Sequence, residues 1–454
     1  MPNITYATSE RFVQRESTNM ETDLLHDGER LFEILTNPFW LTLGWADVAK
    51  NKGAPGIDGV TVEAFQENID QELSRLAEEL LNWTYKPSPV KRVEIEKPDG
   101  GIRLLGIPCV RDRVVQATLK RIIEPVVTPL FSDHSFGFIP KRNQGQAVRE
   151  AQRIVQSGKE WVVDIDLSKF FDRIHHDRLI DRLGKVIKDK RILRLIGKIL
   201  RSGIMKNGLV IPSLEGAVQG SPLSPLLSNV VLDELDKELE RRELEFCRFA
   251  DDCNIFVKSQ KAADRVMKSV SSFIENKLKL VVNQEKSQVA KSREVKFLGL
   301  TIIDGHIAIS IKSMARAMAK VKELTPRGTH LKLEATMEAI NRWYKGWSSY
   351  YSLTQFPSQF VKIEMHVRRR LRSRIIDQQK SRRNLYNKLR KKGVGGKLAA
   401  KTVFSHNKRW ALSHSHAVEK AYPNRYFTKE LKQFKRSTFT EDHWLHPRRW
   451  SRLV

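Results

Sequence analysis

The chain has 454 residues, and its 80 Lys and Arg against 53 Asp and Glu give a formal net charge of +27. Its 9 Trp and 20 Phe exclude a disordered chain, and the absence of a run of about 18 apolar residues excludes a membrane span. Three Cys without a CxxC pair exclude a disulfide framework and offer no zinc site. We expect no targeting signal, because the N-terminus carries acids and has no apolar core. Reducing chemistry and the missing signal predict the cytoplasm of a bacterium, with an organelle as the alternative.

The positive charge is concentrated near the C-terminus. Residues 361–454 contain 26 Lys and Arg against 6 Asp and Glu. A field of this size favours a polyanionic partner, although a solvated helical surface is the alternative. Aromatic residues that could stack on bases are interleaved with the cations and favour nucleic acid: Trp410, Tyr422, Tyr426, Phe427, Trp444 and Trp450.

The first part of the chain predicts helices around a glycine-rich loop. Residues 1–30 are polar and expected to be flexible, and 31–49 is apolar enough for a helix. The loop at 53–59 lacks the GK[ST] of a phosphate-binding P-loop. Residues 63–83 then show helical periodicity with acidic early turns.

A β-hairpin is predicted next. Residues 90–96 alternate like a strand, 98–101 form a turn and 102–107 can return as the second strand. The turn brings Lys97 and Arg103 close together. Ordinary exposed hairpin charges are the simpler interpretation of this pair.

The middle of the chain predicts an α+β domain with an antiparallel sheet. A mostly buried strand at 161–167 carries Asp164 and Asp166. Beyond 312 the pattern is helical and increasingly basic, and 393–396 is glycine-rich like a linker. The elements expected between these regions are helices at 177–200 and 222–243, a hairpin at 246–257, a helix at 261–279 and a strand at 295–303.

Three carboxylates on neighbouring strands indicate nucleotidyl transfer. Asp166 lies at the end of one strand, and the Asp251–Asp252 pair lies 85 residues later at a hairpin tip. By itself such a pair is as consistent with a polar turn. If the three converge, their repulsion predicts bound cations, and Mg²⁺ prefers such oxygen ligands. Two Mg²⁺ ions, with Mn²⁺ as a replacement, could activate a 3′-hydroxyl and stabilise leaving pyrophosphate.

Other segments supply groups that suit a polymerase site. Phe171 follows Asp166 and would place an aromatic face beside the metals, and Gln219 lies in a turn-rich loop before a helix. Gln219 could hydrogen-bond a nucleotide or the template, and Lys286 could serve the triphosphate or protonate pyrophosphate. The apolar turn of Phe297, Leu298 and Gly299 could pack beside a primer terminus. Each motif alone is equally consistent with ordinary core, turn or surface.

Together these motifs resemble those of group II intron-encoded reverse transcriptases with a maturase domain. The resemblance covers roughly residues 31–380, with a weaker similarity in the tail. The residues that carry it are GIDG at 56–59, KPDGGIRLLGIP at 97–108, SFGF at 135–138, DIDLSKFFD at 164–172, QGSPLSPLLSN at 219–229, FADD at 249–252, LxLxxNxxKS at 278–287, FLGL at 297–300, INRWYKGWSSYY at 340–351 and RRRLRSRI at 368–375.

The resemblance implies a role for each matching residue. Asp166, Asp251 and Asp252 would be the catalytic metal ligands, and Lys97 and Arg103 would clamp the incoming triphosphate.

Further roles follow in the same way. Phe171 would lie against the sugar and exclude ribonucleotides, Gln219 would contact the nucleotide or template, and Lys286 would act near the leaving phosphates. Residues 297–299 would be the primer grip. Asp164 is the competing first metal ligand, but the spacing from Asp166 to Phe171 fits a sugar gate better.

The sequence departs from the family pattern at several positions. Phe249 replaces the tyrosine that most relatives carry before Ala-Asp-Asp, which predicts altered fidelity or rate without loss of activity. Ile139 and Lys141 stand where relatives commonly have Arg and Gly, so template contacts are expected to change. The Cys pairs of an HNH endonuclease are missing, so we expect no target DNA cleavage by this chain.

The predicted architecture is an α+β right-hand polymerase with fingers, a palm and a helical thumb. The expected divisions are a flexible segment at 1–30, an N-terminal extension and fingers at 31–160, a palm at 161–305, a thumb and maturase domain at 306–392 and a basic nucleic-acid-binding tail at 393–454.

The predicted function is RNA-directed DNA synthesis combined with promotion of intron splicing and mobility. The expected partners are dNTPs, a DNA primer or target, and group II intron RNA or another RNA template, with no membrane. Two alternatives remain: a domesticated relative in phage defence or DNA repair, and an RNA-binding maturase that acts only in splicing.

Overall fold

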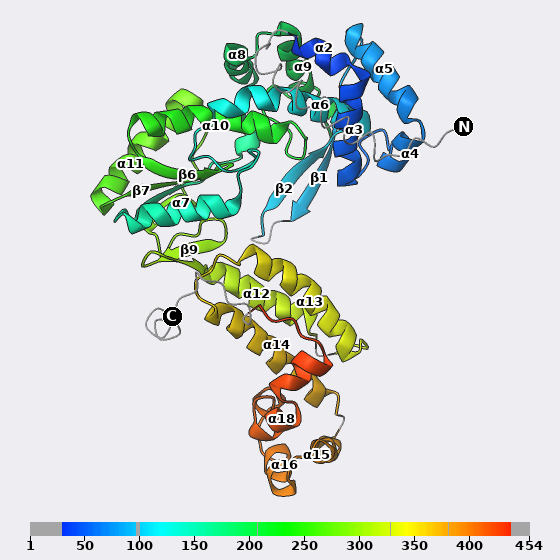
Figure 1. The fold of residues 1–454 in the computed structure, drawn as a ribbon, viewed down its shortest axis with the longest axis vertical. Coiled ribbons are helices and arrows are strands. Elements are labelled where there is room, and N and C mark those ends of the chain that lie inside the picture. Colours follow the sequence, from blue (N-terminus) through cyan, green and yellow to red (C-terminus); the bar gives the residue numbers. More distant parts are fainter. Residues whose placement is uncertain (1–29, 97–99, 207, 327, 380, 437–454) are drawn as a thin grey trace. The chain divides into compact units, whose positions relative to one another are not determined.

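The computed structural model describes residues 30–96, 100–206, 208–326, 328–379 and 381–436. It divides into two compact units (Figure 1). Of the described residues, the first unit contains those up to 290 except 155–157, and the second unit contains those three residues and the ones from 291 onward. In the described part, no helix is both long and apolar enough to cross a membrane.

The first unit begins with a small group of helices. The helix expected at 31–49 is divided, because Asn37 caps a new helix and Pro38 occupies its first position. The helix expected at 63–83 is likewise interrupted at Asn68. The resulting elements are α2 (Leu31–Thr36), α3 (Pro38–Asn51), α4 (Val62–Glu67) and α5 (Ile69–Leu81).

The predicted first hairpin is confirmed and belongs to a larger sheet. Strands β1 (Val90–Glu96) and β2 (Ile102–Ile107) are antiparallel, with Lys91 opposite Ile107. Two short strands that the sequence did not predict, β4 (Ile204–Lys206) and β5 (Leu209–Ile211), extend the sheet in the order β2-β1-β4-β5. Because β4 pairs in parallel with β1, it depends on a contact between segments far apart in the chain.

The second sheet carries the predicted acids. Its order is β6-β7-β3-β8, and its long pairs are antiparallel as expected. Helices α10 (Ser224–Arg241) and α11 (Gln260–Phe273) pack against it (Figure 1). The strands are β3 (Trp161–Ile165), β6 (Glu245–Phe249), β7 (Asp252–Val257) and β8 (Gln288–Lys291).

Four further α-helices lie in the described part of the first unit, except that the last two residues of α7 belong to the second unit. Helix α6 is buried along most of its length, and the carboxylate of Asp112 there accepts hydrogen bonds from the Tyr85 hydroxyl at 2.6 Å and the Ser88 amide at 3.0 Å. These contacts join α6 to the segment that leads into β1. The helices are α6 (Val110–Val127), α7 (Gln144–Gln156), α8 (His176–Val186) and α9 (Lys190–Leu200).

The second unit begins within the segment predicted to belong to the palm. The palm was expected to continue to residue 305, whereas the division falls after 290. Residues 291–305 belong to the second unit because β9 (Leu300–Ile303) pairs with β10 (His306–Ile309) and the preceding turn bonds to later helices. These helices are α12 (Ile311–Leu324), α13 (Leu333–Tyr350) and α14 (Ser358–Asp377).

The predicted basic tail from 393 is folded over much of its described length. Residues 393–395 make only a short turn, and buried Val403, Leu412 and Val418 pack the helices that follow. The expectation of a glycine linker is therefore corrected, because α15 and α16 contact each other directly. The helices are α15 (Arg382–Lys391), α16 (Gly396–Val403), α17 (Arg409–Leu412) and α18 (His416–Ala421).

Candidate active site

A cleft of about 840 Å³ in the first unit brings four predicted residues together. They are Arg103, Phe171, Gln219 and Asp251, and each comes from a different segment of the chain. The cleft also contains cations and an aromatic ring to which the sequence analysis assigned no role, namely Lys50, Arg113, Lys120 and Phe138.

Asp166 follows β3 and is held by the motif at 278–287. The Asn283 side-chain amide donates to its carboxylate at 2.9 Å, and the Asn283 backbone N–H donates to its carbonyl at 2.8 Å. The Asp166 N–H in turn donates to the Ser287 hydroxyl at 3.0 Å. The polar residues of this motif therefore fix Asp166, the predicted first metal ligand, and the sequence reasoning missed this contact.

Asp164 has a different environment from Asp166. It lies within β3 opposite Asn254, and its carboxylate accepts a hydrogen bond from the Gln288 side chain at 3.2 Å. The charge of Asp166 contributes to raising the pKa of Asp251. This charge interaction supports the choice of Asp166 as the acid that works with Asp251.

Asp251 lies in the tight turn between β6 and β7. The preceding Ala250 has a φ of 56°, a left-handed conformation that costs a non-glycine residue about 1–2 kcal/mol. Burial raises the pKa of Asp251 and the Asp166 carboxylate raises it further, while Arg103 opposes the increase. The turn therefore places this carboxyl where a bound cation would stabilise its ionised form.

Asp252 does not form a ready-made ligand cluster with the other two acids. Among the described residues, no three His, Cys, Asp or Glu side chains are arranged to hold a metal ion. Asp252 is exposed at the start of β7, opposite Phe249, whereas Asp251 belongs to the turn. Since a hard divalent cation often binds one or two carboxylates plus substrate phosphates, Asp166 and Asp251 are a fitting donor pair.

Arg103 and Gln219 are connected through β2. The Gly106 N–H donates to the Gln219 carbonyl at 2.8 Å. Gly220 has a φ of 114°, and a Cβ there would lie 2.7 Å from the Gly106 carbonyl oxygen, so only glycine fits this approach. The hairpin that carries Arg103 is thereby fixed to the loop that carries Gln219.

Phe171 lies on a short 3₁₀ turn, Phe170–Arg173, a few residues after Asp166. Phe170 is buried in the core, whereas Phe171 is only partly buried and lines the cleft. Its carbonyl accepts a hydrogen bond from the Ala217 N–H at 2.7 Å. The ring predicted to be a sugar gate is therefore attached to the segment that leads to Gln219.

The other predicted site residues lie elsewhere or are not described. Lys97 lies outside the described residues. Lys286 is exposed, on the loop that carries Asn283 and Ser287. The predicted primer-grip residues 297–299 belong to the second unit, where the Tyr350 hydroxyl donates to the Leu298 carbonyl at 3.2 Å and the Ser313 hydroxyl donates to the Gly299 carbonyl at 2.8 Å.

Phe138 is the clearest cleft residue that the sequence reasoning left without a role. It has a φ of 58° and is 51% exposed, which is unusual for a large apolar side chain. Its place in the SFGF segment was a usable signal. The sequence held no comparable signal for Lys120 and Arg113 on α6, because cations on a helix normally indicate only a solvated surface.

Comparison with known proteins identifies two domains. The reverse transcriptase (RNA-dependent DNA polymerase) family matches residues 95–302, and the group II intron maturase-specific domain matches residues 314–393. Protein YkfC of Escherichia coli is 33% identical over 301 residues, which cover 58% of this chain and 79% of YkfC. The group II intron-encoded protein LtrA of Lactococcus lactis is 28% identical over 385 residues, which cover 70% of this chain but only 63% of LtrA.

Among solved structures, telomerase from Candida albicans in complex with a telomeric RNA fragment aligns with a TM-score of 0.41 and 12% identity, covering 80% of this chain and 71% of that chain. The family matches agree with the motifs and with the presence of Asp251, Arg103 and further cations at the cleft. The chain belongs to the family of group II intron-encoded reverse transcriptases that carry a maturase domain.

Proposed function

We propose that this chain synthesises DNA from dNTPs on an RNA template with a DNA primer, and that it also binds group II intron RNA and promotes its splicing and mobility. The observation that carries the polymerase proposal is the meeting of Arg103, Phe171, Gln219 and Asp251 at one cleft. The maturase-specific domain at 314–393 supports the splicing role. Three free, buried cysteines support work in a reducing compartment such as the bacterial cytoplasm.

Reverse transcriptases generally use divalent metal ions. We assign two Mg²⁺ ions, replaceable by Mn²⁺, to Asp166 and Asp251 with a contribution from Asp252. Bound there, such ions would favour ionisation of the primer 3′-hydroxyl and balance the negative charge of pyrophosphate.

The chain's own groups have complementary roles in this proposal. The Arg103 guanidinium would bind triphosphate oxygens together with Lys97, and Lys286 would act near the leaving phosphates. Phe171 would contact the sugar face and leave no room for a 2′-hydroxyl. Gln219 would orient the nucleotide or the templating base, and residues 297–299 would support the primer end.

Primer extension on an annealed RNA template with dNTPs and Mg²⁺ tests the proposal. We expect the wild-type chain to extend the primer and Asp251→Ala to lose at least about 1000-fold of that rate, because a metal ligand is removed. RNA binding measured on the same preparations should stay within about threefold, because Asp251 contributes no phosphate contact. Synthesis by Asp251→Ala at the wild-type rate would overturn the metal assignment.

A further inference from the structure

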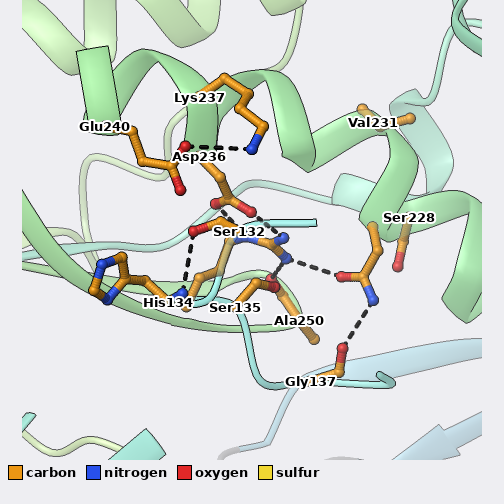
Figure 2. A network of polar contacts seen from close by, with 12 residues as sticks. Ser132, His134, Ser135, Gly137, Ser228, Val231, Asp236, Lys237, Glu240 and Ala250 are labelled. Atoms are coloured by element: carbon orange, nitrogen blue, oxygen red, sulfur yellow. Dashed lines mark hydrogen bonds and ion pairs between the residues drawn. The ribbon is translucent and has the colours of Figure 1, made fainter. Parts of the chain in front are cut away.

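A fully buried ion pair adjoins the turn that carries Asp251 (Figure 2). Arg248 in β6 and Asp236 in α10 both have 0% exposed side chains, and the guanidinium donates to the two carboxylate oxygens at 2.7 and 2.5 Å. A buried pair of this kind often stabilises a fold no better than well-packed apolar residues. Stability alone therefore does not account for two charges at this position.

The third nitrogen of the Arg248 guanidinium, Nη1, bonds to the turn that carries Asp251. Nη1 of Arg248 donates to the Ala250 carbonyl at 2.9 Å and to the Asn229 side-chain oxygen at 3.0 Å. Asn229 is fully buried, and its amide nitrogen donates to the Gly137 carbonyl at 2.8 Å (Figure 2). One arginine thus connects α10, the catalytic turn and the segment that contains Gly137.

Backbone contacts attach the same segment to β6. The Arg248 N–H donates to the His134 carbonyl, and the Phe136 N–H donates to the Arg248 carbonyl, both at 2.9 Å. A Cβ at Gly137 would lie 2.3 Å from the Ala250 nitrogen, so the segment touches the turn itself. Residues 134–138 and the turn therefore form one packed block around Arg248.

This block presents two groups to the cleft. Asp251 follows Ala250, whose left-handed backbone is unusual for alanine and must be held by its surroundings. Phe138 follows Gly137 and lines the same cleft. A shift of either Ala250 or Gly137 would move a group that faces the substrate.

We propose that Arg248 is a positioning residue of the polymerase reaction: through its bonds to Ala250 and Asn229 it holds the Asp251 carboxylate and the Phe138 ring in register with each other. The inference rests on the proposed function, in which Asp251 binds metal and the cleft binds the nucleotide. It adds a residue that contacts neither metal nor substrate and acts through Asp251, which binds the metal, and through Phe138, which lines the nucleotide cleft.

Arginine is required by this arrangement. The planar guanidinium offers five N–H donors in a fixed fork, which serve Asp236, Asn229 and Ala250 together. A lysine ammonium keeps the charge but bonds as a single point, so it can pair with Asp236 and lose the turn. Arg248→Lys therefore keeps the positive charge beside Asp236 and removes only the hydrogen bonds that position the turn.

The first experiment measures single-turnover primer extension by Arg248→Lys across a range of Mg²⁺ concentrations. We expect the maximal rate to fall about 10- to 100-fold, as displaced catalytic groups commonly cause. The Mg²⁺ concentration for half-maximal rate should rise, because the carboxylate is no longer held in place. A maximal rate and Mg²⁺ dependence equal to those of the wild type would overturn the proposal.

A double variant, Arg248→Met with Asp236→Leu, removes both charges and keeps an apolar core. We expect its melting temperature to stay near that of the wild type while synthesis falls as in Arg248→Lys. If the pair were only structural, this variant would regain both the wild-type rate and the wild-type Mg²⁺ dependence. That recovery would contradict a positioning role even if Arg248→Lys folds poorly.

Asn229→Ala tests the link to Phe138 separately. It breaks the bridge to Gly137 but leaves the bond from Arg248 to Ala250, so we expect a higher KM for dNTP with little change in Mg²⁺ dependence. An unchanged KM would remove Phe138 from the proposal. Arg241→Lys is the matched control, since Arg241 pairs with Glu238 on the exposed side of α10 and should behave as wild type.

Asp251→Ala distinguishes a failure of the positioning role from a failure of the metal assignment. If Asp251→Ala is inactive and Arg248→Lys is normal, only the positioning role fails. If Asp251→Ala is fully active, the metal assignment fails, and the positioning role fails with it.

Discussion

Buried arginines occur in both units, but their partners differ. In the first unit, burial opposes the charge of Arg248, yet Asp236 raises its pKa above the ordinary value. In α14 of the second unit, burial lowers the pKa of Arg372 and Arg374. Their partners include neutral oxygens: Arg372 donates to the Tyr422 carbonyl at 2.9 Å, and Arg374 donates to the Thr336 hydroxyl at 2.6 Å.

A basic sequence is therefore not the same as a basic surface. The RRRLRSRI segment contributed to the expectation of a nucleic-acid-binding region, yet Arg368, Arg372 and Arg374 are buried. They join α14 to other parts of the second unit, and Arg369 lies over the Trp410 ring at 4.4 Å. Cations on α15 and α16, such as Arg383, Lys391 and Lys397, are exposed instead and are better candidates for phosphate contacts.

The largest expected effect on folding is that of Arg372→Ala. The substitution leaves the Tyr422 carbonyl without this donor and removes the guanidinium from the Phe427 ring, so we expect a loss of about 3 kcal/mol of stability in the second unit. Chemical denaturation should show this loss, and primer-independent RNA binding by the remaining folded chain should keep its salt dependence. A changed salt slope with unchanged stability would place Arg372 at the RNA surface.

The next effect concerns substrate choice in the first unit. Phe171→Ala should reduce discrimination against ribonucleotides by about 10- to 100-fold, since a cavity replaces the partly buried ring. The ratio of kcat/KM for dNTP and rNTP measures the change, with Phe138→Ala as the comparison within the same cleft. Unchanged discrimination in Phe171→Ala would assign the sugar gate to another residue.

The exposed cations of the second unit should have a smaller effect, spread over several phosphates. Replacing Lys391 and Lys397 by Gln should lower the slope of log affinity against log salt by about 2, because each substitution frees one phosphate of the RNA from its lysine. RNA binding at several salt concentrations gives this slope. The melting temperature should not change, in contrast to Arg372→Ala, and a wild-type slope would exclude these two lysines from the RNA-binding surface.

The smallest expected effect is a pH dependence of stability that comes from Asp233, close to the Arg248–Asp236 pair. Burial and the charge of Asp236 raise the pKa of Asp233 from 3.8 to about 6. The folded state therefore favours the protonated form, and this contribution to stability is lost as the pH rises from about 4 through 6. Asp233→Asn should stabilise the chain by about 1 kcal/mol at pH 8, allowing for partial exposure, and hardly at pH 4. Equal gains at both pH values would contradict the titration.

Local patterns in the sequence predicted the elements that local forces stabilise. The hairpin of β1 and β2 was predicted because alternating residues flank a Pro-Asp-Gly-Gly turn, and the β6–β7 hairpin because apolar arms flank the acids. Strands β4 and β5 have three residues each and were missed. Strand β4 depends on its parallel pairing with β1, which no local pattern records.

The sequence by itself determined the family and the candidate groups, because spaced acids, a Phe five residues after Asp166 and the Gln-Gly-Ser-Pro loop form a combination that is hard to obtain by chance. Only the tertiary structure decided which groups share the cleft, which acid Asn283 and Ser287 hold, and which arginines are buried. The physical reason is that charge and residue type belong to the chain, whereas desolvation and hydrogen-bond partners arise from contacts between distant segments.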